Sequence, residues 1–112
     1  MLNASVTVQL ADMFRLLGDP NRLRVVLYCL SGPKSVGDIA RHLELSQTLV
    51  SHHLRLLRAA RLVRGTRRSR QVFYELADHH VSGMLLDMAR HVCEDCGDAD
   101  PDSASSPETQ PK

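Results

Sequence analysis

Apolar residues recur every three or four positions through most of the chain, which is the spacing of helices that bury one face. Residues 6–17 follow this spacing and stop at Gly18, a residue type that suits the C′ position after a helix. A second helix is predicted in the segment GDPNRLRVVLYCL, with Asp19 as its N-cap and Pro20 at its first position. The chain therefore opens with two amphipathic helices.

Two further helices with capping residues follow a predicted turn, SGPK. Ser35, with Asp38 three residues later, has the form of a capping box and opens the short helix VGDIARHL. After a break at Glu44-Leu45, Ser46 is the predicted N-cap of the helix QTLVSHHLRLLRAARL. Its buried stripe should comprise Leu49, Val50, His53, Leu54, Leu57 and Ala60.

The segment LVRGTRRSRQVFYEL predicts a β-hairpin, because β-branched and aromatic runs flank a tip that extends from Gly65 to Arg70. A last helix should run from about Asp78 to Glu94, with Val81, Met84, Leu85, Met88 and Val92 on one face. Residues 97–112 are almost devoid of apolar side chains and are expected to form a disordered acidic tail. Residues 1–96 are thus predicted to form a mainly α-helical domain, a helix-turn-helix with a hairpin wing.

Charge is divided unevenly between the two parts of the chain. Residues 1–76 contain twelve Lys and Arg against five Asp and Glu, a net +7, and residues 77–112 contain two against eight, a net −6. The basic part predicts a polyanionic partner. No run of eighteen apolar residues and no basic-then-apolar leader is present, so a cytoplasmic protein without a membrane partner is expected.

The helix after the break presents short polar side chains opposite its buried stripe, as suits base edges and phosphates in a major groove. The predicted contacts to double-stranded DNA are Ser46, Gln47, Thr48, Ser51 and His52, with Arg55 and Arg58 reaching phosphates. Arg67, Arg68 and Arg70 form a cationic hairpin tip suited to the DNA backbone or minor groove. Helix capping alone also explains Ser46, and His53 is predicted to point inward.

Asp78 and His80 stand at the start of the last helix, and His91 and Glu94 stand near its end. From His80 to His91 the helix rises roughly 16 Å, whereas zinc ligands lie about 2 Å from the metal. Antiparallel packing against a second copy would bring the first pair beside the partner's second pair and form two identical intersubunit sites. Two imidazoles and two carboxylates suit tetrahedral Zn²⁺ or Co²⁺, and Ni²⁺ would need further ligands such as His79.

The segment SQTLVSHHLRLLRAARLV resembles the recognition helix of the ArsR/SmtB family of bacterial metal-sensing repressors, and the likeness extends from about Leu10 to Glu94. The resemblance implies a winged-helix homodimer that binds a palindromic operator and changes its affinity when an inducer binds. The spacing D-x-H-x10-H-x2-E is similar to the family's zinc site in the C-terminal helix, whereas SVGDIA lacks the Cys-x-Cys of its other common site. Arg61 stands where the family usually has Gly, and a left-handed Arg61 would cost on the order of 1 kcal/mol.

The odd count of three cysteines argues against a secreted disulfide framework and fits reduced thiols. Some relatives of this family sense oxidants or reactive sulfur through one cysteine in the second helix and one in the last, an arrangement that Cys29 with Cys93 or Cys96 approximates. A softer metal held by cysteines, such as Cu(I) or Cd²⁺, is a further alternative. An enzyme acting on a small organic substrate is not expected, because four protein ligands leave zinc no open position.

Overall fold

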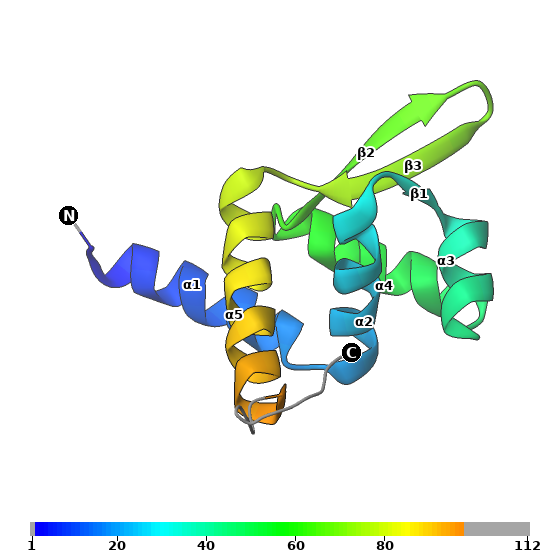
Figure 1. Ribbon diagram of the computed structural model, residues 1–112. Coiled ribbons are helices and arrows are strands. Elements are labelled where there is room, and N and C mark those ends of the chain that lie inside the picture. The colour runs from blue at the N-terminus through cyan, green and yellow to red at the C-terminus, as the bar shows by residue number, and fades with distance from the viewer. Residues whose placement is uncertain (1, 98–112) are drawn as a thin grey trace. The chain divides into compact units, whose positions relative to one another are not determined.

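The computed structural model describes residues 2–97 (Figure 1). The predicted tail, residues 97–112, lies outside this range except for Gly97, which ends the final helix. The chain divides into two units, Met1–His79 and His80–Lys112. Among residues 2–97, no helix is long and apolar enough to cross a membrane.

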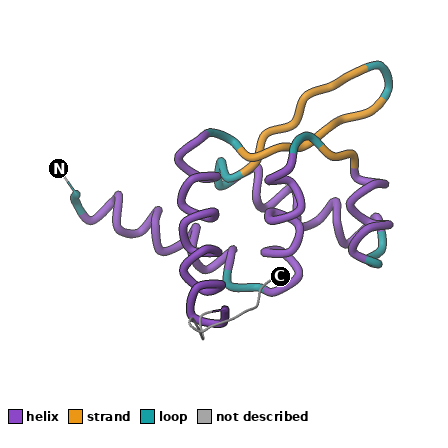
Figure 2. The backbone as a smooth tube through the Cα atoms, viewed as in Figure 1, coloured by secondary structure: helices purple, strands orange, loops and turns teal. Residues whose placement is uncertain are grey.

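The first unit is mainly α-helical and carries a small antiparallel sheet (Figure 2). Its elements run in the order α1 (Ala4–Leu17), α2 (Pro20–Tyr28), the 3₁₀ helix η1 (Cys29–Ser31), β1 (Lys34–Ser35), α3 (Val36–Leu43), α4 (Gln47–Ala59), β2 (Val63–Arg68) and β3 (Gln71–Leu76). The predicted succession of four helices and a hairpin is confirmed, and the fold is a winged helix-turn-helix.

Side-chain caps explain where α2, α3 and α4 begin. Each predicted N-cap accepts the backbone N–H three residues further on: Asp19 from Arg22 at 2.9 Å, Ser35 from Asp38 at 3.1 Å and Ser46 from Leu49 at 3.0 Å. A cap of this kind stabilises a helix by about 1 kcal/mol. The three predicted helix starts are therefore confirmed by hydrogen bonds.

The core of this unit joins α2, α3, α4 and β2 through aliphatic side chains. The most deeply buried of them are Val25, Val26, Ile39, Val50, Leu54, Leu57 and Val63. Burying each such side chain contributes roughly 1.5–3 kcal/mol. Because both helices of the helix-turn-helix contribute to this cluster, the packing that stabilises the fold also orients α4.

Strands β2 and β3 form an antiparallel hairpin that projects from the helices of its unit (Figure 1). Their pairing continues as far as Arg68 opposite Gln71, so the turn between the strands consists of Ser69 and Arg70. The predicted six-residue tip from Gly65 to Arg70 is therefore wrong in extent, since four of those residues belong to β2.

The position of Gly65 explains why the predicted tip was too long. Gly65 lies opposite Tyr74, and a Cβ at Gly65 would stand only 3.1 Å from Cε2 of that ring. The glycine therefore serves a close packing contact within the strand and marks no turn. Strand β1 was not predicted, because Lys34 was placed in a turn and Ser35 at the start of a helix. It pairs with Tyr74 and Phe73 and gives the strand order β1-β3-β2.

The second unit contains α5 (His79–Gly97), which begins at the last residue of the first unit. The helix starts one residue after the predicted Asp78 and continues beyond the predicted Glu94. Along it, Leu86, Met88 and Val92 are 41, 55 and 58% exposed, large values for apolar side chains.

Candidate nucleic-acid interface and metal-binding residues

The turn between α3 and α4 is stabilised by backbone hydrogen bonds. Glu44 adopts the left-handed conformation at φ 58° and ψ 48°. The N–H of Leu45 donates to the carbonyl of Ala40 at 3.0 Å, and the N–H of Glu44 donates to that of Arg41 at 3.4 Å, the two bonds of a Schellman motif. Ser46 then caps α4 directly, so the two helices are joined by a short connection.

Helix α4 has one buried and one exposed face, as the sequence indicated. Val50, His53, Leu54 and Leu57 are buried, and Leu49 and Ala60 at the edges of the predicted stripe are half-buried. The predicted DNA-contacting residues occupy the other side: Gln47, Thr48, His52, Arg55 and Arg58 are exposed and Ser51 is half-buried. Ser46 is exposed as well, and its hydroxyl caps the helix while keeping a proton to donate.

His53 is the exception among the polar residues of α4, because its side chain is only 6% exposed. Within the described part of the chain neither ring nitrogen has a hydrogen-bond partner. Burial lowers the pKa of His53, and the positive charge of Arg22 lowers it further, against a smaller opposite effect of Asp19. The inward orientation predicted for His53 is confirmed, and the imidazole is neutral at pH 7.

At the end of α4, Arg61 adopts the left-handed conformation, with φ 61°. The N–H of Arg61 donates to the carbonyl of Arg58, and that of Leu62 donates to the carbonyl of Leu57, both at 2.9 Å. These bonds form a second Schellman motif, in which the left-handed position usually belongs to glycine. The turns before and after α4 thus each contain a non-glycine residue at positive φ, Glu44 and Arg61.

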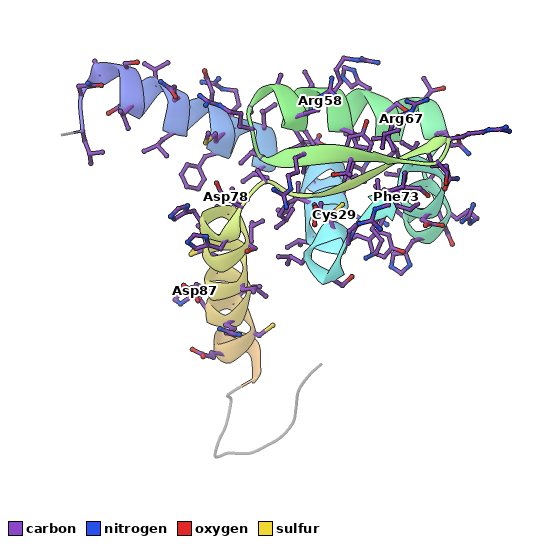
Figure 3. All side chains as sticks on the ribbon, turned by 90° about the horizontal axis from the view of Figure 1, so that it is seen from above. Cys29, Arg58, Arg67, Phe73, Asp78 and Asp87 are labelled. Carbon is purple, nitrogen blue, oxygen red and sulfur yellow. The ribbon has the colours of Figure 1, made fainter. Side chains whose placement is uncertain are left out.

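The hairpin carries the predicted arginines on two different faces, because side chains alternate along a strand. Arg67 shares a face with Val63, Gly65 and Tyr74, while Arg68 shares the other with Arg64. Arg64 Nε lies 3.2 Å from Oε2 of Glu75, directly opposite in β3. Arg67, Arg68 and Arg70 are all exposed, and Figure 3 shows Arg67 on the hairpin and Arg58 on α4.

Phe73 is a residue of this region that sequence reasoning missed. The guanidinium carbon of Arg68 lies 5.7 Å from the centre of its ring, within the range of a cation–π contact. Phe73 pairs with Thr66, and Arg68 is two residues further along the same face of β2. The alternation of side chains along β2 and β3 places Arg68 and Phe73 on one face once the pairing register is known. The predicted tip included Arg68, so this register could not be read from the sequence.

The four predicted metal ligands stand at the two ends of α5. Asp78 precedes the helix, His80 is its second residue, and His91 and Glu94 lie three residues apart towards its other end. All four side chains are exposed. Within residues 2–97 no three His, Cys, Asp or Glu side chains gather closely enough to hold a metal ion. A single chain therefore does not bring the two pairs together.

The cysteines differ in their surroundings. Cys29 is 2% exposed, and burial raises the pKa of its thiol to about 11 in spite of the nearby positive charge of Lys34. Cys93 is exposed, and the side chain of Cys96 lies outside the described residues. Because the thiolate is the reactive form, the surroundings of Cys29 disfavour the predicted redox alternative that uses it.

Comparison with known proteins agrees with this architecture. Residues 19–64 match the bacterial regulatory protein, arsR family. The chain is 41% identical over 86 residues to a transcriptional repressor SmtB homolog of Synechocystis, and this match spans 77% of the chain but only 65% of the homolog. The chain therefore covers somewhat less than two thirds of that relative.

Two solved structures are similar as well. The cadmium metal-sensor CMTR of Mycobacterium tuberculosis has a TM-score of 0.64 and 40% identity, with 73% of this chain and 85% of CMTR covered. The homodimeric winged helix-turn-helix DNA-binding domain Mb0332 of Mycobacterium bovis has a TM-score of 0.73 and 25% identity, with 80% and 82% covered. The chain belongs to the arsR family of bacterial regulatory proteins.

Proposed function

We propose that this chain is a metal-responsive transcriptional repressor that binds operator DNA as a homodimer in the cytoplasm. The observation that carries the proposal is the two-sided α4, whose buried face anchors it in the core while its polar face is exposed beside an arginine-bearing hairpin. The family consists of regulatory proteins and not of enzymes, and the Synechocystis relative is named as a repressor.

In the proposed complex α4 enters the major groove. Gln47, Thr48, Ser51 and His52 would face base edges and nearby phosphates, and Arg55 and Arg58 would bind phosphates further along the strand. The hairpin arginines would contact the adjacent backbone or minor groove. The net charge of +7 over residues 1–76 favours such binding and predicts that it weakens steeply with salt.

Homodimerisation would use the apolar side chains that α5 exposes. Met88 and Val92, which lie one turn apart on the same side of α5, would lose contact with water if two copies of this helix packed together. The solved relative Mb0332 is homodimeric. A two-fold axis would then present two α4 helices to successive major grooves, which are about 34 Å apart along one face of the DNA.

The same axis supplies the proposed metal site. Asp78 and His80 of one subunit would bind the metal together with His91 and Glu94 of the partner subunit, which accounts for a ligand set divided between the ends of one helix. This donor set fits Zn²⁺ best, and Co²⁺ or Ni²⁺ are the alternatives. The solved relative CMTR is a cadmium sensor, which supports metal response in general.

Metal response would follow from the connection between α5 and the DNA-binding unit. Ligands from both subunits would hold the two α5 helices in one arrangement, in which the two α4 helices are spaced poorly for successive grooves. A coupling free energy of about 1–3 kcal/mol would lower the affinity for DNA roughly 5- to 150-fold.

The experiment that tests this function measures DNA affinity by fluorescence anisotropy, with a duplex that the protein selects from a random-sequence library. Wild-type protein should release the duplex when Zn²⁺ is added, and His91→Ala should bind it equally well but fail to release it. Asp87→Ala is the matched control, because it removes a carboxylate of α5 outside the proposed site. Release by His91→Ala at the wild-type zinc concentration would show that this site is not the sensor.

A further inference from the structure

The hairpin arginines differ in how firmly their side chains are held. Arg68 lies over the ring of Phe73, with 5.7 Å between the guanidinium carbon and the ring centre. Arg67 and Arg70 have no such ring contact among the described residues. An arginine that is free to sample many rotamers loses that freedom on binding, whereas one already held in place loses less.

Phe73 is itself anchored more firmly than the hairpin tip. It lies in β3, the central strand of the sheet, between Thr66 of β2 and Ser35 of β1. Ser35 is buried and caps α3, the first helix of the helix-turn-helix. The backbone that carries the ring under Arg68 is therefore paired on both sides, and one of its partners caps the helix-turn-helix.

This face of the sheet leads to the start of α4. Ser35, paired with Phe73, begins the turn that contains Gly37 of α3. A Cβ placed on Gly37 would stand 3.9 Å from Nε2 of Gln47, the first residue of α4. Arg68, Phe73 and the start of α3 are thus neighbours in succession within one unit, and Gln47 at the start of α4 lies near Gly37 of α3.

We propose that Phe73 is a positioning residue for DNA binding, which holds Arg68 ready to contact a phosphate or the minor groove of the duplex that α4 binds. The inference rests on the proposed function and adds to it a division of labour within the hairpin. Arg68 contributes a fixed contact, and Arg67 and Arg70 contribute mobile positive charge. Phe73 acts on DNA only through Arg68 and touches no base itself.

A double-mutant cycle tests this relationship, with Phe73→Leu, Arg68→Ala and the double variant compared with wild type. Phe73→Leu should weaken DNA binding roughly two- to fivefold, the range that an exposed cation–π contact supplies. It should leave the dependence of log Kd on log salt unchanged, because the charge remains. Arg68→Ala should reduce that slope by about 1. In the Arg68→Ala background, Phe73→Leu should then have no further effect.

Two controls separate positioning from a general effect on the hairpin. Phe73→Tyr keeps an aromatic ring and should bind DNA as wild type does. Arg70→Ala removes a tip charge outside the contact, so its effect and that of Phe73→Leu should add independently. If Phe73→Leu weakens DNA binding equally with and without Arg68, or does not weaken it at all, the positioning role of Phe73 is wrong. DNA binding by the wild-type protein would still support the proposed function in that case. Absence of DNA binding by folded wild-type protein would overturn both.

Discussion

The backbone N–H of Leu62 donates to the carbonyl of Leu57 at 2.9 Å and closes the end of α4. Leu57 and Leu62 occupy the two positions of a Schellman motif that usually form an apolar contact, and both side chains are buried. Arg61, directly before Leu62, is held at φ 61° as a consequence. The hydrogen bonds and the packing around Arg61 therefore outweigh the strain of its backbone.

Replacing Arg61 by glycine should stabilise the protein. The strain that is relieved exceeds the conformational entropy that glycine adds to the unfolded chain, so the free energy of unfolding should rise by roughly 0.5–1 kcal/mol. Thermal unfolding followed by circular dichroism should show a Tm about 3–5 °C higher. Arg61→Ala keeps the Cβ and should show no such rise, and equal stabilisation by both variants would mean that charge and not backbone strain matters.

His53 should make stability depend on pH. Because burial lowers its pKa from the ordinary value of 6.5, the unfolded chain takes up a proton at this position before the folded protein does. The contribution of the neutral imidazole is fully present above about pH 6.5 and is lost as the pH falls through the lowered pKa of the folded state. The free energy of unfolding, measured by urea titration, should decrease over this range.

The variant His53→Leu isolates this contribution. It removes two buried ring nitrogens that have no partner among the described residues, so it should be at least as stable as wild type at pH 7. Its stability should also fall less between pH 7 and pH 5. His52→Ala, an exposed neighbour on α4, should keep the wild-type dependence. A His53→Leu profile parallel to that of wild type would contradict this account of His53.

The cysteines should react at very different rates. With a pKa of about 11, Cys29 holds little thiolate near pH 7, and its burial excludes reagents. Iodoacetamide should therefore modify exposed Cys93 in the native protein long before Cys29, as measured by mass spectrometry of peptides. Unfolding in urea should remove the difference. Fast modification of Cys29 in the native state would restore the thiol-switch alternative.

Replacing all three cysteines by serine gives an independent test of the same alternative. The proposed metal site contains no cysteine, so the triple variant should still release DNA when Zn²⁺ is added. Loss of that response in a folded variant would transfer the sensing site to thiol ligands.

Sequence reasoning located what local chemistry determines. The caps at Asp19, Ser35 and Ser46 depend on bonds that span three residues, and the buried stripe of α4 follows helical spacing. The family's usual glycine likewise pointed to Arg61 as a position where a left-handed backbone would matter, and the structure has φ 61° there. Such features can be predicted because each depends on a few neighbouring positions.

Features that depend on tertiary pairing could not be predicted in this way. Strand β1 has only two residues and forms because it pairs with β3. Two residues are too few to show the alternation of apolar and polar side chains that predicts a strand. Gly65 suggested a turn, although its role is to leave room for Tyr74 across the hairpin. The contact between Arg68 and Phe73 required the correct register. The ligand pairs at the ends of α5 remain a prediction, because their meeting requires a second chain.

Complementation between two defective subunits tests the proposed intersubunit site. Two variants each remove half of the ligands from both sites of a homodimer. The first is Asp78→Ala/His80→Ala and the second is His91→Ala/Glu94→Ala. A mixed dimer, isolated with two different affinity tags after reduction of all thiols, should regain one complete site, formed by the intact pair of each subunit.

Co²⁺ titration of the three dimers, followed by absorption spectroscopy, provides the measurement. The account predicts that intense visible d–d bands, without a thiolate band in the near ultraviolet, appear in the mixed dimer at one Co²⁺ per dimer and are absent from both homodimers. A mixed dimer that binds no more Co²⁺ than the homodimers, or a thiolate band in any of the three, would contradict it.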